Sequence, residues 1–388
     1  MSRVEQLQQA LDEAGADAMV LRLAENVLLA TGYWVQIGGL GIAVVPRQGE
    51  AALLVPEYEE PEARGSWPGD LRTFPAIRFD GESAPAAIDR ILRQLAQEHG
   101  AAGGTIGYEG SFDSVAPPRL DGEPNAVSGG TQALIRSTFS TEKLVDVTPA
   151  LEAIRLVKSE HDLDRLRVTN QIAKLGLDAF KEHAVAGRTE AEVAAAVESA
   201  MVAGGHGYEG ARTVRAYATV LSGPETAAGW QYFLHRARRI EQDDVVMLEL
   251  GTCADGYWSD HTRTVVAGTA TDRQREALAA VLAGADAALA AAKPGATGGE
   301  VDAASRAAVA AAGFEQFPHH TGHGTGFRYH ESRPQLVPAG EHALEAGMVI
   351  VTEPGIYEEG LGGFRWEDDA VVTAEGGRLL AETDYGLD

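Results

Sequence analysis

The fold of this chain is limited first by an acid pair in an apolar, strand-like segment. Residues 245–266 read VVMLELGTCADGYWSDHTRTVV, two β-prone arms around an Ala-Asp-Gly turn, and so predict a hairpin. In it we expect Glu249 to lie directly opposite Asp260, with Cβ atoms roughly 4.5–5.5 Å apart. A buried carboxylate without a partner costs on the order of several kcal/mol, and two that face each other repel. The pattern therefore predicts a cation between these side chains.

A second acid pair is predicted near the C-terminus. The segment VIVTEPGIYEEGLGGFRWEDDAVV reads as another hairpin, whose glycine-rich turn centres on Gly360. In that register Glu353 lies opposite Glu367. Two hairpins that each present opposed acids on apolar arms are atypical of solvated surfaces and favour a site.

Between the two hairpins, FPHHTGHGTGFRYHESRP carries four histidines among glycines: His319, His320, His323 and His330. Neutral imidazole is the commonest nitrogen ligand for metals, and glycine allows close backbone approach. Four carboxylates balance the charge of two divalent cations, with one histidine as an extra ligand. Such oxygen-rich coordination suits Mn²⁺ and tolerates Co²⁺ or Zn²⁺. Two ions about 3.5–4 Å apart can bridge a hydroxide for attack on a carbonyl, so these residues predict a dinuclear hydrolytic centre.

The charge balance excludes several classes of partner. The net charge is −25 and the pI is near 4.8, so a nucleic acid or an anionic membrane would repel the chain.

Cys253 is the single cysteine, which excludes an intrachain disulfide and a thiolate metal cluster. The acidic N-terminal segment is unlike a signal peptide, and we expect a cytoplasmic protein. No GxGxxG follows an expected strand and no GxxxxGK[ST] occurs, so no nucleotide cofactor is indicated.

The 388 residues predict two domains. Residues 1–140 alternate short strands with helical patterns, such as 3–14 and 84–100, and predict a small α/β domain. Residues 145–388 combine long helices with antiparallel hairpins and predict an α+β domain. Its expected helices begin after Ser159 and Thr189 and cover 271–292 and 299–312, and its expected strands cover 213–221, 245–251, 257–267, 347–357 and 364–373.

Four motifs resemble the metal-dependent peptidases of the pita-bread fold, which include Xaa-Pro dipeptidases (prolidases), aminopeptidase P, methionine aminopeptidase and creatinase. The motifs are ELGTCADGYWSDHTRT, HHTGHGTGFRYHE, GMVIVTEPGIY and GGFRWED. The N-terminal segment ENVLLATGYW resembles the creatinase-like accessory domain, which methionine aminopeptidases lack. The resemblance implies a pita-bread catalytic domain over 145–388, preceded by a creatinase-like α/β domain over 1–140.

The resemblance also implies a ligand set. Asp260 and Glu367 would bridge both metal ions, and Glu249 would complete one of them. His323 and Glu353 would complete the other, and Glu353 is also expected to be catalytic. The family usually has aspartate where this chain has Glu249, so we expect one ion to be shifted, bound more weakly or present at part occupancy.

Further site residues follow from the same resemblance. His319 would contact the substrate near the scissile bond, and His330 would stabilise the tetrahedral intermediate. Arg365 would support Glu367. The family commonly has a histidine where this chain has Tyr232, so either His235 makes that substrate contact through a local insertion or the proline side is recognised in a different way.

The resemblance implies hydrolysis of the bond preceding proline by a metal-bridged hydroxide. Xaa-Pro dipeptides are the expected substrates, and Arg333 is the candidate clamp for their free carboxylate. The alternatives are an aminopeptidase P that acts on longer Xaa-Pro-Xaa peptides, a non-peptidase amidohydrolase, and a metal-free binding module. Metal-free proteins are disfavoured because all five ligand positions are acid or imidazole, and the four acids would repel one another. The expected assembly is a homodimer.

Overall fold

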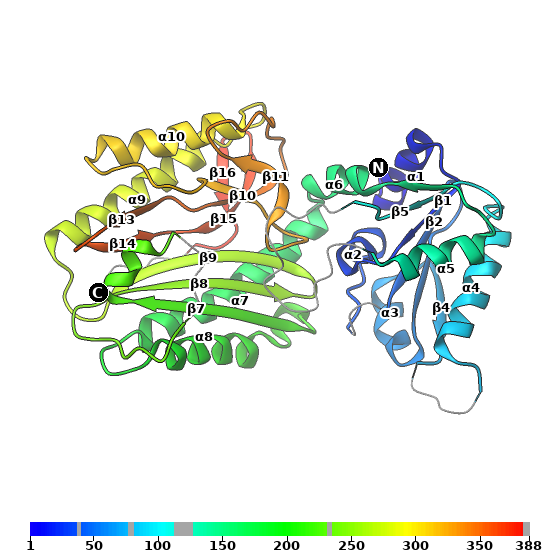
Figure 1. The fold of residues 1–388 in the computed structure, drawn as a ribbon, viewed down its shortest axis with the longest axis horizontal. Helices are drawn as coiled ribbons and strands as arrows, with labels where there is room; N and C mark the ends of the chain where they lie inside the picture. The colour runs from blue at the N-terminus through cyan, green and yellow to red at the C-terminus, as the bar shows by residue number, and fades with distance from the viewer. Residues whose placement is uncertain (37–39, 77–80, 112–126, 231–234, 383–388) are drawn as a thin grey trace. The chain divides into compact units, whose positions relative to one another are not determined.

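The computed structural model describes residues 1–388 except 37–39, 77–80, 112–126, 231–234 and 383–388. The chain forms two compact units, Met1–Arg155 and Leu156–Asp388. Each unit has its own sheets and its own buried core, and each is described by itself (Figure 1).

The N-terminal unit is built on a six-stranded sheet of order β4-β3-β2-β1-β5-β6, in which β1 pairs antiparallel with β2 and parallel with β5. Helix α4 buries Ile88, Ile91, Leu92 and Leu95 against it, the spacing of one helical face. The α/β architecture predicted for this region is confirmed. Its elements are α1 (Arg3–Ala14), β1 (Ala18–Leu21), α2 (Ala24–Thr31), β2 (Ile42–Pro46), β3 (Ala52–Pro56), α3 (Glu60–Ser66), β4 (Asp70–Phe74), α4 (Ala84–Glu98), β5 (Ile106–Tyr108), α5 (Gly129–Phe139), β6 (Leu144–Asp146) and α6 (Thr148–Leu156).

The C-terminal unit combines helices with antiparallel strands, as predicted. Helices α7 and α8 cover one face of the β7-β8-β9 sheet, and α9 and α10 pack side by side (Figure 1). The other strands form a β11-β10-β12-β15-β16 sheet and the β13-β14 pair. The elements are α7 (Glu160–His183), α8 (Glu190–Gly205), β7 (Val214–Ser222), β8 (Val245–Ala254), β9 (Tyr257–Val266), α9 (Asp272–Ala291), α10 (Gly298–Ala311), β10 (Gly322–Gly324), β11 (Glu331–Leu336), β12 (Val349–Thr352), β13 (Gly355–Glu358), β14 (Gly362–Arg365), β15 (Asp368–Thr373) and β16 (Gly376–Leu379).

Side-chain capping sets the starts of the helices in this unit. Ser159 and Thr189, the predicted N-caps, each accept a hydrogen bond from the backbone N–H three residues later. The side chains of Asp162 and Glu192 return a bond to the cap backbone, so both ends are capping boxes. The N-terminal ends predicted for α7 and α8 are therefore confirmed.

The predicted register of the β8–β9 hairpin is wrong by two residues. Glu249 pairs with Thr262, and Asp260 pairs with Gly251. The turn consists of Asp255 and Gly256, which both have positive φ (48° and 85°), instead of centring between Ala254 and Asp255. A shift of two residues keeps every side chain on its original face. Glu249 and Asp260 therefore still share one face of the sheet, as diagonal neighbours and not as a direct pair.

The second hairpin has the predicted register, but it is broken in the middle. Gly355 pairs with Arg365 in β13–β14, and Thr352 pairs with Asp368 in β12–β15, around the turn at Gly360. The two predicted strands, 347–357 and 364–373, are each divided into two, and the halves belong to different sheets. Pro354 lies at this break, where its lack of an N–H removes a possible ladder bond. Glu353 and Glu367 lie at the break and do not oppose each other in a ladder.

Candidate metal centre

Two buried acids lie on the face of the β8–β9 hairpin that points away from α7 and α8. Leu248 and Leu250 pack into the helical core, so Glu249, between them, points to the opposite side. Tyr329 brings its hydroxyl between the acids, 3.0 Å from Glu249 Oε1 and 2.5 Å from Asp260 Oδ1. This single hydroxyl proton can be donated to only one of the two carboxylates at a time.

Glu367 joins this pair from the broken hairpin. It forms an isolated bridge with Thr262, whose hydroxyl lies 2.5 Å from Glu367 Oε2 and 3.2 Å from Glu249 Oε2. Oxygen atoms of Glu249, Asp260 and Glu367 all lie within 4.8 Å of one another. Three buried carboxylates at this spacing form an all-oxygen group suited to a hard divalent cation.

The imidazoles of His323 and His330 lie beside this group of acids. Asp260 Oδ2 lies 3.4 Å from His330 Nε2 and 3.6 Å from His323 Nε2. Glu353 Oε1 also lies 3.6 Å from His323 Nε2. His323 directs Nδ1 at the carbonyl of Gly324 (3.0 Å), and its buried Nε2 has no hydrogen-bond partner among the described residues. This nitrogen faces two carboxylates at distances that leave room for an ion, so the residues present fit a metal centre.

His319 lies beside this group and not within it. Its Nε2 is 3.0 Å from the Tyr357 hydroxyl, and its Nδ1 is 2.7 Å from the carbonyl of His320. The distance from Nδ1 to Glu353 Oε2 is 4.0 Å. Burial lowers the pKa of the His319 imidazole to about 4, so the ring is neutral at pH 7.

The acids titrate as members of a crowded group. Burial, together with the Glu249 charge, raises the pKa of the Asp260 carboxyl to about 6. Burial and the Asp260 charge raise the pKa of Glu367 well above its ordinary value. Burial opposes the ionisation of Glu353 too, but the neighbouring imidazoles, His320 first, hold its pKa well below the ordinary value. A cation beside Asp260 and Glu367 would favour their ionised forms and so lower these two pKa values.

Arg365 supplies part of that positive charge. Its guanidinium is buried and forms an ion pair with Glu249, whereas its Nε lies 3.9 Å from Glu367 Oε2. The same Nε donates to the Thr262 hydroxyl at 3.1 Å. Arg365 therefore contacts Glu249 more closely than Glu367, the acid that it was predicted to support.

Two predicted substrate contacts lie outside this cluster. His235 is exposed, and Arg333 is an exposed residue of β11. Among the described residues, neither side chain forms a hydrogen bond or an ion pair with the four acids. Tyr232 lies outside the described residues. The substrate roles of His235 and Arg333 stay predictions.

Three residues at this site were not assigned a role from the sequence: Thr262, His320 and Tyr329. Thr262 follows Asp260 by two residues on a strand, so period-two alternation alone places it on the same face. Tyr329 and His320 belong to the histidine-rich segment. Their places depend on how that segment folds back over β8, which no local pattern gives.

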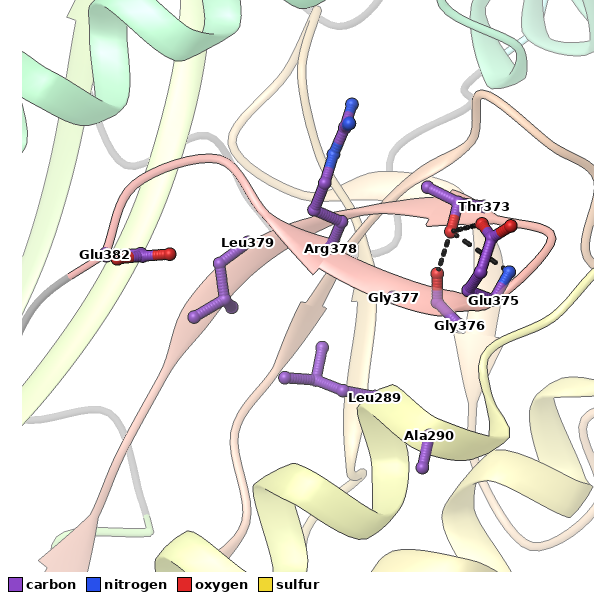
Figure 2. Close-up of a pocket in the computed structure, with 9 residues that line it drawn as sticks. All are labelled: Leu289, Ala290, Thr373, Glu375, Gly376, Gly377, Arg378, Leu379 and Glu382. Carbon is purple, nitrogen blue, oxygen red and sulfur yellow. Dashed lines mark hydrogen bonds between the residues drawn. The ribbon is translucent and has the colours of Figure 1, made fainter.

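A second hollow, between the end of α9 and the β15–β16 hairpin, has no comparable chemistry (Figure 2). The Thr373 hydroxyl donates to the Gly376 carbonyl at 2.7 Å and also interacts with the Glu375 carboxylate. None of the nine residues drawn there is a histidine or a cysteine. The hydrogen bonds among Thr373, Glu375 and Gly376 stabilise the turn itself, so the acid and histidine cluster is the candidate for chemistry.

In the part of the chain that the structure describes, no helix is long and apolar enough to cross a membrane.

Comparisons with known proteins cover both units. The model described as Metallopeptidase family M24 matches residues 164–374, and the model described as Creatinase/Prolidase N-terminal domain matches residues 3–157. A Xaa-Pro dipeptidase of Pyrococcus furiosus is 30% identical over 386 residues, which is 99% of each chain.

Solved structures give the same likeness. The prolidase from Pyrococcus horikoshii OT3 is similar with a TM-score of 0.78 and 27% identity, over 100% of this chain and 99% of that one. An X-Pro aminopeptidase from Thermotoga maritima MSB8 is similar with a TM-score of 0.75 and 26% identity, over 99% and 98%. The likeness therefore extends through both units, and the acid and histidine cluster lies within residues 164–374, which match the M24 model.

Proposed function

Since the chain belongs to metallopeptidase family M24, we propose that it hydrolyses the peptide bond that precedes proline, with Xaa-Pro dipeptides as its preferred substrates. The family makes the protein a peptidase that uses divalent metal ions. The observation that carries the proposal is the cluster of buried acids and imidazoles, in a chain 30% identical over 99% of its length to a Xaa-Pro dipeptidase.

The proposed centre holds two divalent ions. Asp260 and Glu367 would bind both, Glu249 would complete one, and His323 with Glu353 would complete the other. The overlap of the residue groups supports this sharing, because Asp260 belongs to an all-oxygen group and also to a group with His323 and His330. Mn²⁺ is the proposed metal, since most of the donors are carboxylate oxygens.

Bound ions would lower the pKa of a water molecule and polarise the scissile carbonyl. The protein's own groups would then act on the substrate. Glu353, whose Oε1 lies 3.6 Å from His323 Nε2, would take a proton from the attacking water. His330, whose Nε2 points toward Asp260, would donate to the developing oxyanion. His319, neutral and held by Tyr357, would position the substrate near the scissile bond.

The same proposal includes a cytoplasmic homodimer. The N-terminal domain resembles the creatinase-like domain through which members of this branch often pair, which supports the dimer, and a composition with a single cysteine fits a reducing compartment. Sedimentation equilibrium would give the mass of the assembly, and a monomer at micromolar concentration would contradict this part alone.

Aminopeptidase P activity is the second candidate, because an X-Pro aminopeptidase is among the similar structures. The two candidates differ in substrate length. We would strip the protein of metal and assay a Xaa-Pro dipeptide and a Xaa-Pro-Xaa tripeptide, with and without Mn²⁺, and use a Xaa-Ala dipeptide as the control. Manganese-dependent cleavage of the Xaa-Pro dipeptide alone is expected. Preference for the tripeptide would make the protein an aminopeptidase, and cleavage of neither would overturn the proposal.

A further inference from the structure

His320 contacts the candidate centre, although it is not one of the five predicted ligands. Its Nε2 lies 2.7 Å from Glu353 Oε1, nearer than His323 Nε2, which is 3.6 Å from the same oxygen. The two imidazole rings are perpendicular, with centroids 5.5 Å apart. Ligand atoms of His320, His323 and Glu353 all lie within 4.8 Å of one another. One carboxylate oxygen therefore has two imidazole nitrogens beside it.

The backbone on both sides of His320 is fixed. Arg306 donates to the carbonyls of Phe317 and His319, each at 2.6 Å, and it is itself bonded to Asp302. Beyond His320, the Thr321 hydroxyl donates to the same Asp302 at 2.7 Å. The Asp302–Arg306 pair thus holds the chain before and after His320, so the ring is presented to Glu353 by a rigid support.

His320 is also accessible, unlike the other nitrogen donor. Its side chain is 38% exposed, whereas the side chain of His323 is 4% exposed. A cavity lined in part by Arg306, Pro318, His319 and His320 lies beside this ring. An ion from solvent can therefore reach His320 without displacing a packed side chain.

We propose that His320 supplies a second imidazole nitrogen to the ion held by His323 and Glu353. The inference rests on the proposed dinuclear centre and gives its two sites different chemistry. The site of Glu249, Asp260 and Glu367 offers oxygen alone, whereas the other offers two nitrogens as well as oxygen. Imidazole favours Zn²⁺ and Co²⁺ over Mn²⁺, so the His320 side should bind the former ions first.

Metal binding tests this directly. We would titrate Co²⁺, Zn²⁺ and Mn²⁺ into stripped wild type, His320→Gln and the control His161→Gln, which changes an exposed histidine of α7. His320→Gln should weaken the first Co²⁺ and Zn²⁺ ions by at least ~10-fold and Mn²⁺ by less, and should change the visible spectrum of bound Co²⁺. The control should match wild type. Circular dichroism would establish that each variant is folded.

A ligand swap covers the case in which His320→Gln disturbs the loop. His320→Cys should restore Zn²⁺ affinity but not Mn²⁺ affinity, because a thiolate is a soft ligand. Unchanged affinities in His320→Gln would overturn the inference. Weaker binding with an unchanged Co²⁺ spectrum would also overturn it, because His320 would then only hold Glu353 by a hydrogen bond.

These measurements separate the inference from the proposed function. If wild type binds the ions through His320 but does not cleave Xaa-Pro peptides, the function fails and the inference stands. If wild type cleaves them with Mn²⁺ and His320→Gln binds all three ions normally, the inference fails alone.

Discussion

Glu109 of the N-terminal unit and Asp260 of the C-terminal unit are both buried carboxylates, but they are compensated in different ways. Glu109 accepts hydrogen bonds from the backbone N–H groups of Arg22 and Leu23, each at 3.0 Å, and from Asn26 Nδ2 at 3.2 Å. These donors lie at the start of α2, where Leu23 offers no capping side chain. Asp260 faces other acids and imidazoles, with one tyrosine hydroxyl shared with Glu249.

The pKa values do not separate these two roles. Burial raises the pKa of Glu109 to about 7 and that of Asp260 to about 6. The partners do separate them: Glu109 has backbone and amide donors of its own, whereas Asp260 shares its tyrosine hydroxyl with Glu249 and lies beside two further acids, an arrangement that a cation would stabilise. Four predictions follow from this difference.

Asp260→Asn should have the largest effect. The change removes a charge that both proposed ions need, so metal binding and hydrolysis should be lost, a larger loss than the ~10–100-fold typical of an outer partner. Bound metal per chain and kcat/KM on a Xaa-Pro dipeptide measure this. Glu109→Gln is the matched control and should keep both properties. Retained hydrolysis in Asp260→Asn would contradict the dinuclear assignment.

Metal addition should stabilise wild type by a smaller amount. At a free metal concentration 1,000-fold above Kd, a ligand that binds only the folded state adds ~4 kcal/mol to the free energy of unfolding. Urea titrations of stripped protein, with and without Mn²⁺, measure this gain. Asp260→Asn should show little of it. An equal gain in that variant would place the ion elsewhere.

Glu109→Gln should change how stability depends on pH. The Glu109 pKa is about 7 when folded and near 4.5 when unfolded, so the folded state binds the proton more tightly. Its contribution is therefore fully present below pH 4.5 and is lost as the pH rises through 7, a loss of about 3 kcal/mol. The difference in unfolding free energy between wild type and Glu109→Gln, measured from pH 4.5 to 7.5, should fall by that amount. A constant difference would mean that Glu109 stays ionised.

Tyr329→Phe should have the smallest effect. It removes the one hydroxyl between Glu249 and Asp260, which should cost ~2 kcal/mol of stability in the stripped protein. With ions bound the cost should shrink, because the cations then compensate the acids. Denaturation of both forms measures this change. A cost that is the same with and without metal would mean that the acids rely on protein donors, as Glu109 does.

Local patterns predicted much of this site, because two of its acids lie on regular strands. Alternation placed Glu249 and Asp260 on one face, and an error of two residues in the turn left that face unchanged. The capping boxes of α7 and α8 could also be predicted, because each joins residues only three positions apart. The family comparison confirms the expected fold class, a creatinase-like N-terminal domain and an M24 domain.

The site residues that were assigned no role from the sequence are placed by contacts between segments that lie far apart in the chain. Thr262 meets Glu367 across 105 positions of the chain, and Tyr329 reaches Glu249 across 80. No period of two or 3.6 residues encodes such contacts. Arg333 and His235 were predicted from the family resemblance; both side chains are exposed, and their substrate roles stay predictions.

The broken hairpin has a consequence for how the chain can vary in length. Both of its halves keep one register around an exposed tip at Glu359 and Gly360, beyond the last paired residues, Glu358 and Gly362. Residues inserted at this tip would leave both ladders in place, whereas one residue inserted between Glu353 and Gly355 would reverse the faces of β13. The tip is therefore the position at which a peptide tag or a loop from another protein can be grafted while the spacing of the acids is kept.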